Sequence, residues 1–513
     1  MDSSARTLLP SGLAPPIRIV RNGQAVARTD IPSVSMDDFR RAVLGACSAK
    51  ARLAAMAVLP GHASGRVLLA VLADDKSQRL GLLCTGFPLV NRYPALTPDL
   101  PQAQAFEREI LEDHGLVPEG HPWPKPLRRH AELEGPCDAR VGPDGYPFFR
   151  VEGPGIHEVA VGPVHAGIIE PGHFRFQCHG ETVLHLEIQL GYQHRDAQAL
   201  LLRSSPARRL VIAETIAGDT SVGHALAYCM ALEGLTGTTP PPQAEAMRGI
   251  ALELERTANH VGDLGALCND VGYLPGASWF GRLRGEFLNL SLEICGSRFG
   301  RGLVIPGGVR FNLPPSSREA FLARLQAAGA DLRHIADVVF QTSAVVSRFE
   351  GTGVVTTAMA ETLGLVGVVA RASGCDRDVR RDHPTGIYRR TGIEPATPSS
   401  GGVMARAQIR RREAEHSIAL VREQVEALPD GARSVVLREP RPQALAVALV
   451  EGWRGEIAHV ATTDDKGKLA AYKVFDPSFH NWLGLALAMR GGQISDFPLC
   501  NKSFNLSYAG HDL

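Results

Sequence analysis

The first third of the chain combines one helical pattern with short apolar runs. Residues 36–55 mix polar and apolar positions at helical spacing. Residues 66–73 and 80–84 are short apolar runs, which are typical of buried strands. Prolines at alternate positions over 122–126 indicate an extended linker, because proline fixes the backbone and cannot continue a helix. The pattern predicts a small α/β domain over residues 1–145 that ends in this Pro-rich linker.

A two-residue period marks two later segments as β structure. Residues 173–176 and 182–190 alternate apolar and polar side chains, and Gly180 lies between them. This alternation predicts two strands, and glycine is favoured where the chain reverses. We therefore expect a β-hairpin that turns near Gly180. Residues 464–468 read D-D-K-G-K and predict a second turn, between paired strands.

The middle of the chain carries the period of α-helices. Residues 223–235 and 244–267 have apolar side chains at i, i+3 and i+4 spacing and predict core helices. Residues 316–348 predict a long amphipathic helix that is broken or bent at 328–329, where an alanine precedes a glycine. A further helix is expected to run from about residue 401 to 428.

Charge and cysteine usage narrow the class of protein. Lys+Arg and Asp+Glu both total 54, so no global field indicates nucleic acid or an anionic membrane as a partner. No apolar run approaches the roughly 18–20 residues of a membrane helix, and we expect no secretion signal. None of the nine cysteines shares a C-x-x-C spacing, so no zinc ribbon or cluster-binding loop is encoded locally. The pattern predicts reduced, mostly buried thiols in a cytosolic protein.

Two distant stretches resemble the two halves of one metal site. Residues 217–224 read A-G-D-T-S-V-G-H, and residues 505–510 read N-L-S-Y-A-G. These frames resemble C-G-x-C-x-x-x-H and D-P-C-x-x-C, with which the large subunits of nickel-iron hydrogenases hold their metals. The four cysteine positions are occupied here by Ala217, Thr220, Ser507 and Gly510. These residues lack the soft anionic donor that nickel needs. The resemblance implies the hydrogenase scaffold without its metal.

An earlier motif resembles a second protein family. Residues 106–110 read F-E-R-E-I and are followed by D-H-G and, a few positions on, by G-H-P. The plain interpretation is an acidic and basic helix start before a Pro-rich loop. The motif also resembles the accessory subunit that lies beside the quinone-site subunit of respiratory complex I. The resemblance implies that this accessory domain is fused to the hydrogenase-like part.

The segment of the predicted hairpin contains two histidines, and the residues around them match a motif of a known family. Residues 162–176 contain G-P-x-H, with His165, and then G-H-F-R-F, with His173. They resemble the first hairpin shared by complex I large subunits and membrane-bound hydrogenases, which implies that His173 lies at a quinone cavity. In complex I an aspartate pairs with that histidine, so the resemblance implies a contact between His173 and Asp270. The alternative is a histidine in a surface loop. His173, Asp270 and His224 are our candidates for proton transfer.

Several arginines match basic positions of the same families. Arg256 and His260 are spaced i, i+4 and share a helix face, which is either a packed polar stripe or, as the resemblance implies, the junction with an iron–sulfur subunit. The families place Arg298 and Arg310 at the cofactor cavity or the small subunit, although arginines beside glycines also bridge backbone carbonyls. The resemblance implies that Arg371 lines the cavity rim.

These features predict an α+β fold. A small α/β domain, residues 1–145, precedes a mainly α-helical domain like that of hydrogenase large subunits, residues 146–513. This second domain has a β-hairpin near its start and a small β region near its C-terminus. The resemblance extends from about residue 100 to 513 and keeps the order of the family's motifs.

The resemblance leaves several functions open. The expected function is a peripheral-arm subunit of a membrane-bound, complex I-related oxidoreductase, which couples electron transfer to ion translocation without a nickel-iron site. One alternative is the quinone-site subunit of an NADH:quinone oxidoreductase, although the tyrosine that donates to quinone aligns with Gly218. A non-catalytic scaffold that gates the membrane arm is another. The four missing thiolates oppose an active hydrogenase.

The same resemblance implies cofactors and partners. We expect no cofactor bound by this chain, an iron–sulfur cluster in a small partner subunit, and quinone as a candidate ligand. The expected membrane partners are antiporter-like and quinone-channel-like subunits, and nucleic acid is not expected. The chain is expected to be cytoplasmic and peripheral, held on the inner face of the cell membrane by these partners.

Overall fold

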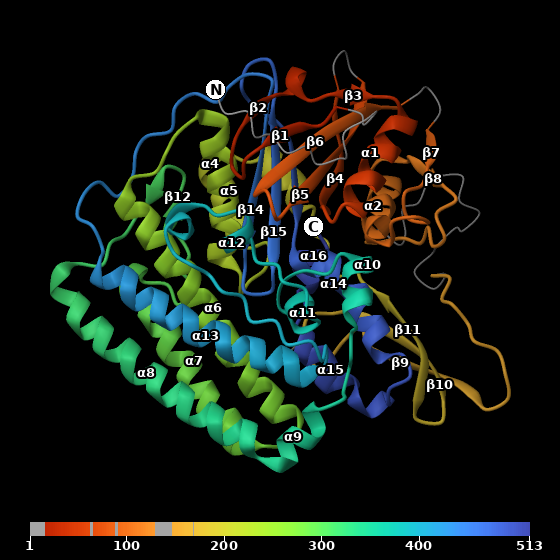
Figure 1. The fold of residues 1–513 in the computed structure, drawn as a ribbon, viewed down its shortest axis with the longest axis vertical. Helices are drawn as coiled ribbons and strands as arrows, with labels where there is room; N and C mark the ends of the chain where they lie inside the picture. Colours follow the sequence, from red (N-terminus) through yellow and green to blue (C-terminus); the bar gives the residue numbers. More distant parts are fainter. Residues whose placement is uncertain (1–15, 62–64, 88–90, 129–145, 168) are drawn as a thin grey trace.

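The structure is a computed structural model that describes residues 16–61, 65–87, 91–128, 146–167 and 169–513. It has a mixed α+β fold, as predicted. Figure 1 shows an N-terminal sheet region at the upper right, long helices at the lower left, and a small sheet that projects at the lower right. The predicted domain boundary at 145–146 adjoins residues 129–145, which lie outside the described residues, as does Cys137.

The N-terminal sheet has the strand order β1-β6-β5-β4, with β3 parallel to β6. Its elements are β1 (Arg18–Val20), β3 (Ser33–Val34), α1 (Met36–Ser48), β4 (Arg52–Pro60), β5 (Arg66–Asp74), β6 (Arg79–Gly86) and α2 (Gln104–His114). The predicted strands at 66–73 and 80–84 are confirmed as β5 and β6.

The predicted helix at 36–55 is wrong beyond Ser48. Ser35 caps α1 by accepting a hydrogen bond from the Asp38 backbone N–H. The helix then ends, Lys50 has a positive φ of 74°, and β4 begins. All residues of β4 except Pro60 are buried. A strand that is apolar on both faces has no period of two, so its sequence cannot be told from that of a buried helix.

The β region near the C-terminus takes a strand from the other end of the chain. Its order is β16-β15-β14-β2, with β2 (Val26–Ala27), β14 (Ala444–Glu451), β15 (Glu456–Thr463) and β16 (Leu469–Phe475). The predicted turn at 464–468 joins β15 to β16. The ring of Phe106 on α2 lies 5.0 Å from that of Phe475 on β16. Residues from both predicted domains therefore pack into one core.

The predicted hairpin is confirmed. Strand β10 (His173–His179) pairs antiparallel with β11 (Thr182–Gln189), and Gly180, at φ +58°, lies in the turn. A strand that the sequence did not reveal, β9 (Ile156–Val161), pairs with the other edge of β10. The segment 162–172 joins β9 to β10 and carries His165.

Helices α6 (Pro242–Asp270), α7 (Leu274–Cys295), α8 (Pro315–Gln341) and α13 (Val403–Glu426) pack against one another in the lower left of Figure 1. Helix α5 (Ser221–Thr236) lies above them in this view and packs against β14. Of the predicted break or bend at 328–329, the break is wrong, because α8 continues to Gln341 and α9 (Ser343–Phe349) follows. A Cβ on Gly329 would lie 3.2 Å from the Ile418 side chain of α13. The glycine thus permits close helix packing.

Short elements complete the described chain. They are η1 (Arg28–Asp30), β7 (Arg92–Pro94), η3 (Pro101–Ala103), β8 (Val117–Glu119), α3 (Ala197–Arg203), α4 (Pro206–Glu214), β12 (Val304–Ile305), β13 (Gly308–Val309), α10 (Thr357–Leu363), α11 (Gly367–Ala372), α12 (Val379–Asp382), η4 (Gly386–Arg389), α14 (Pro477–Met489), η5 (Ile494–Asp496), α15 (Phe497–Phe504) and α16 (Tyr508–His511). No helix among the described residues is long and apolar enough to cross a membrane.

Candidate functional site

The two half-frames meet around a buried arginine. Arg454 lies in the turn between β14 and β15, and its guanidinium donates to the Asp219 carboxylate at 2.6 and 2.8 Å. Its Nε also donates to the Asn505 carbonyl at 2.5 Å. Asp219 belongs to the early frame and Asn505 to the late one. One side chain thus joins stretches almost 290 residues apart, and we call this the junction site.

The four positions that match cysteines are packed or hydrogen-bonded. The Thr220 hydroxyl accepts from Trp453 Nε1 at 3.1 Å and from Arg454 at 3.2 Å. The Ser507 hydroxyl caps α16 by accepting from the Gly510 N–H at 2.9 Å. Ala217 is fully buried. A Cβ on Gly510 would lie 2.6 Å from the Asp476 carboxyl carbon, so Asp476 occupies the space that a side chain at 510 needs.

Replacing Gly510 with alanine is expected to lower the free energy of unfolding by about 1–3 kcal/mol, the usual cost of overpacking a core. The added methyl group meets the Asp476 carboxyl group in a site without free volume. Urea unfolding of the variant measures the loss. The matched control is Gly281→Ala on the exposed side of α7, where nothing lies within 4 Å and alanine should stabilise the helix by about 0.5–1 kcal/mol. If Gly510→Ala costs as much stability in an Asp476→Ala background as in the wild type, the two positions are not coupled, which would contradict the steric cause.

His224 belongs to a chain of buried hydrogen bonds that begins at the junction site. Its Nε2 lies 3.0 Å from Asp476 Oδ2, and its Nδ1 lies 3.1 Å from His459 Nε2. The Tyr472 hydroxyl lies 2.8 Å from His459 Nδ1. One set of tautomers satisfies every member: Tyr472 donates to His459, His459 to His224, and His224 to Asp476. The sequence indicated His224 but not His459 or Tyr472.

Burial and neighbours shift the pKa values in this chain. Burial lowers the pKa of His459 well below its usual value, and His224 beside it acts in the same direction. Burial by itself would raise the pKa of Asp476, but the His224 hydrogen bond and the nearby Arg454 charge lower it. His459 is therefore neutral and Asp476 ionised at neutral pH.

Two further carboxylates surround the junction site. Glu255 accepts from the backbone N–H groups of Val222 and Gly223, at 2.7 and 3.0 Å, where α5 begins. Burial raises the pKa of Glu255 to about 8 despite these donors. Glu170, between β9 and β10, accepts from the Tyr508 and Ala509 N–H groups, and burial raises its pKa as well. Neither residue was predicted, because each depends on a contact distant in sequence.

His173 and Asp270 line different cavities, so the contact implied by the resemblance does not form. His173 Nδ1 lies 3.1 Å from the Gly162 carbonyl, its Nε2 accepts from Arg175, and it lines a cavity of about 490 Å³. Asp270 ends α6 and lines a cavity of about 220 Å³, which we call the α6-end cavity. The hairpin histidine that shares this cavity with Asp270 is His165.

Asp270 is the carboxylic acid among the three candidates for proton transfer, and its pKa is raised toward neutral pH. Burial raises its pKa to about 6, and the Lys502 charge opposes the shift. Burial lowers the pKa of His173. At a pH near 6 the Asp270 carboxyl group can therefore both donate and accept a proton.

The Asp270→Asn variant is expected to lose the part of the pH dependence of stability that the Asp270 carboxyl group causes. The folded-state pKa of about 6 exceeds the usual 3.8, so the wild-type protein loses stability as the pH rises from about 4 to 6. Because Asp270 is partly exposed, we expect solvent to reduce this loss to about 1 kcal/mol. Unfolding midpoints at pH 4.5 to 7 measure it, with Asp465→Asn, an exposed turn residue, as the control for lost surface charge. Parallel profiles of wild type and Asp270→Asn would contradict the assignment.

Arg256, His260 and Arg371 lie inside the chain, in an ion cluster between α6, α11, α13 and β14. Arg371 donates to Glu413 and to Glu451, at 2.8 Å each, and His260 lies 2.9 Å from Glu413. Arg256 donates to Glu253 and to the carbonyls at the end of β14. All three side chains are fully buried. In the isolated chain these three residues therefore form a packed polar stripe in the core, which was one of the two interpretations of the Arg256 and His260 helix face.

Arg298 and Arg310 are exposed on the loop that follows α7. Both are therefore available to a partner chain. Their neighbour Arg301 donates to Ser221 at the start of α5, at 3.3 Å, and the Glu214 carboxylate accepts from the Gly302 N–H. These contacts hold the loop beside the early frame.

The early frame, the late frame and the hairpin lie together on one helical body. This combination defines the large-subunit class of hydrogenases and complex I. The family model described as "Respiratory-chain NADH dehydrogenase, 49 Kd subunit" matches residues 270–443. The "Carbon monoxide-induced hydrogenase" of Rhodospirillum rubrum is 33% identical over 350 residues, which are 68% of this chain and 97% of that protein.

Other relatives come from both branches of this class. The "Hydrogenase-4 component G" of Escherichia coli is 29% identical over 82% of this chain and 76% of that protein. A subunit of the "NADH-quinone oxidoreductase" of Thermosipho melanesiensis is 26% identical over 66% of this chain and 94% of that protein. The chain belongs to the superfamily of complex I and hydrogenase large subunits, which are subunits of oxidoreductase complexes.

Proposed function

We propose that this chain is a peripheral-arm subunit of a membrane-bound, complex I-related oxidoreductase that has no nickel-iron site. It would couple electron transfer from a partner iron–sulfur subunit to ion translocation by antiporter-like and quinone-channel-like membrane subunits. The relatives support the setting, since they include subunits of a "Membrane-bound hydrogenase" and of an "F(420)H(2) dehydrogenase". The chain would lie on the cytoplasmic face of the membrane, held there by these partners.

The observation that carries the proposal is the junction site. A nickel-iron centre needs soft thiolate donors, and the four matching positions supply a methyl group, two hydroxyl groups and no side chain at Gly510. Both hydroxyls, on Thr220 and Ser507, are already hydrogen-bonded. Asp476 fills the space beside Gly510. The residues present do not fit a nickel-iron group.

The residues of the chain would handle protons. An iron–sulfur cluster in the partner would supply electrons one at a time. Asp270 can hold a proton in the α6-end cavity, and the ionised Asp476 orients His224 at the junction site through a hydrogen bond. Arg454 fixes the Asp219 carboxylate and keeps it ionised. Arg298 and Arg310 are exposed and would contact the partner.

A quinone-site function is the second candidate, and the α6-end cavity favours it. Apolar side chains, Ile169, Phe174 and Phe497, line it together with the polar groups of Asp270 and His165. An apolar pocket with a few polar groups suits a quinone ring. Gly218 weighs against this function, because it stands where complex I has its donor tyrosine. A scaffold without chemistry is the third candidate, favoured by the filled space at Gly510.

Purification of the complex from its native membrane through a tag on this chain tests the proposal. We expect mass spectrometry to identify an iron–sulfur small subunit and antiporter-like membrane subunits in fixed ratio with the tagged chain. A quinone extracted with the complex, and lost in an Asp270→Ala variant, would favour the quinone-site function. Recovery of the chain without an iron–sulfur subunit would contradict the proposal.

A further inference from the structure

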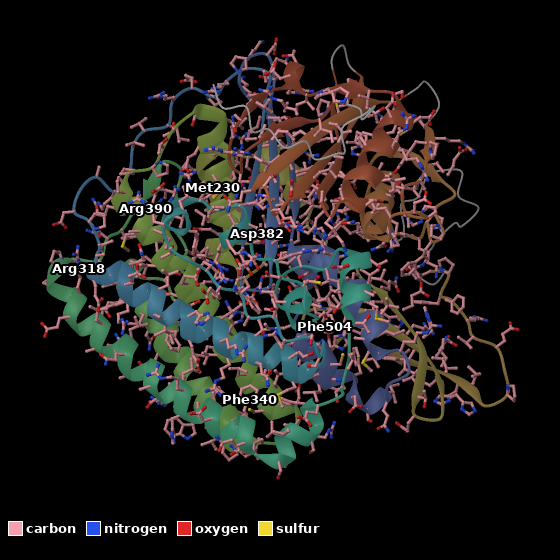
Figure 2. The ribbon with its side chains drawn as sticks, in the orientation of Figure 1. Met230, Arg318, Phe340, Asp382, Arg390 and Phe504 are labelled. Carbon is pink, nitrogen blue, oxygen red and sulfur yellow. The ribbon has the colours of Figure 1, made fainter. Side chains whose placement is uncertain are left out.

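A cavity of about 400 Å³ lies on the side of the helical body that faces the N-terminal segment. Its walls come from residues 22–25, the second half of α5, the start of α6, and η4. Figure 2 labels Met230, one of the α5 residues at this cavity. None of its lining residues belongs to the junction site or to the α6-end cavity.

One part of the cavity is apolar and buried. Leu226, Met230, Ile387 and Tyr388 line it, and each is less than a tenth exposed. The Tyr388 hydroxyl donates to the buried Glu253 carboxylate, which fixes the plane of the ring. A flat apolar group would therefore find a preformed surface.

The other part of the cavity carries excess positive charge. The Glu233 and Arg248 side chains neutralise each other through two hydrogen bonds of 2.6 and 3.0 Å. Arg389 and Arg441 also line the cavity, and neither guanidinium forms an ion pair with any described residue. The negative charge of Glu245 offsets part of their positive charge.

The α6 residues that line the cavity are Glu245, Arg248 and Gly249, in the first turns of the helix. The guanidinium groups of Arg389 and Arg441 suit a phosphate group, with which arginine forms paired hydrogen bonds.

We propose that this cavity binds an organic phosphate monoester with a flat apolar body. The volume lies within the roughly 300–1,000 Å³ of ligand pockets, and such pockets often form where two parts of a chain meet. The apolar body would lie on Tyr388 and Met230, and the phosphate would lie between Arg389 and Arg441. This site is independent of the proposed redox function.

Isothermal titration of the purified full chain tests the proposal with three probes: 1-naphthyl phosphate, 1-naphthol and inorganic phosphate. The first carries both groups and each of the others carries one. We expect 1-naphthyl phosphate to bind at least about tenfold more tightly than either of the others, because the two parts of the cavity act together. Binding no tighter than that of inorganic phosphate would overturn the proposal.

Variants locate the binding. The double variant Arg389→Glu/Arg441→Glu should weaken 1-naphthyl phosphate at least about tenfold and leave 1-naphthol unchanged. Thr239→Trp, at an exposed lining residue, should block both by filling the cavity. The control is Arg412→Glu, an exposed arginine of α13 outside the cavity, which should change neither. Unchanged 1-naphthyl phosphate binding in Thr239→Trp and in the double variant would place the probe elsewhere and overturn the proposal.

Discussion

The Arg371→Ala variant is expected to lose about 3–5 kcal/mol of its free energy of unfolding, the usual cost of removing one partner from a buried ion pair. Arg371 is fully buried and donates to both Glu413 and Glu451. Its removal leaves two carboxylates in the core without this guanidinium. Urea unfolding followed by tryptophan fluorescence measures the loss.

The pH dependence of this loss identifies its cause. Burial by itself would raise the pKa of Glu413, but Arg371 holds it well below its usual value. Burial raises the pKa of Glu451 to about 7 although Arg371 opposes the rise, so removing the guanidinium raises the folded-state pKa of Glu451 further and the deficit grows as the pH rises. The deficit at pH 5.5 should therefore be smaller than at pH 7.5. The control Arg412→Ala removes an exposed arginine of α13 and should change stability by less than about 0.5 kcal/mol. A deficit that does not depend on pH would refute an electrostatic cause.

The Arg128→Ala variant is expected to lose about 3 kcal/mol and to release the end of the chain. The Arg128 guanidinium lies 3.0–3.2 Å from Glu109, Glu112 and Asp113, in the middle and last turn of α2. It also donates to the Leu513 carbonyl at 2.6 Å. Because Lys473 still contacts Glu109 and Asp113, the loss should fall at the lower end of the range for buried pairs.

Two measurements separate the release of the chain end from a general loss of stability. Carboxypeptidase should remove the last residues of Arg128→Ala much faster than those of the wild type under native conditions. The control is Arg92→Ala, which breaks the half-exposed pair with Glu119 and should cost less than about 1 kcal/mol. Equal digestion of Arg128→Ala and wild type would mean that other contacts hold the C-terminus, such as those of Asp512 with the Gly191 and Gln193 N–H groups.

The sequence predicted the hairpin and the longest helix. Strands β10 and β11 alternate because one face packs on the core, and α6 is long enough for its helical period to show although most of its residues are buried. The chain between residues 49 and 60 could not be assigned in this way, since β4 is buried on both faces. The glycine at 329 was misinterpreted because a small residue either ends a helix or lets a neighbour approach.

The sequence predicted only those residues of the candidate site that belong to local motifs. His224 and Asp270 stand in recognisable frames, but the partners of His224 lie 235 and 252 residues away, on His459 and Asp476. The pairing of His173 with Asp270 came from a resemblance, and the structure places the two residues at different cavities. The filling of the Gly510 position by Asp476 is a tertiary contact that no local pattern records.

The most direct test of the account is the metal content of the purified complex with its partner subunits retained. We expect iron and acid-labile sulfide, from clusters in the partner, and no nickel, because Ala217, Thr220, Ser507 and Gly510 supply no thiolate. Nickel at about one atom per chain would contradict the central claim, since other residues would then have replaced the missing cysteines.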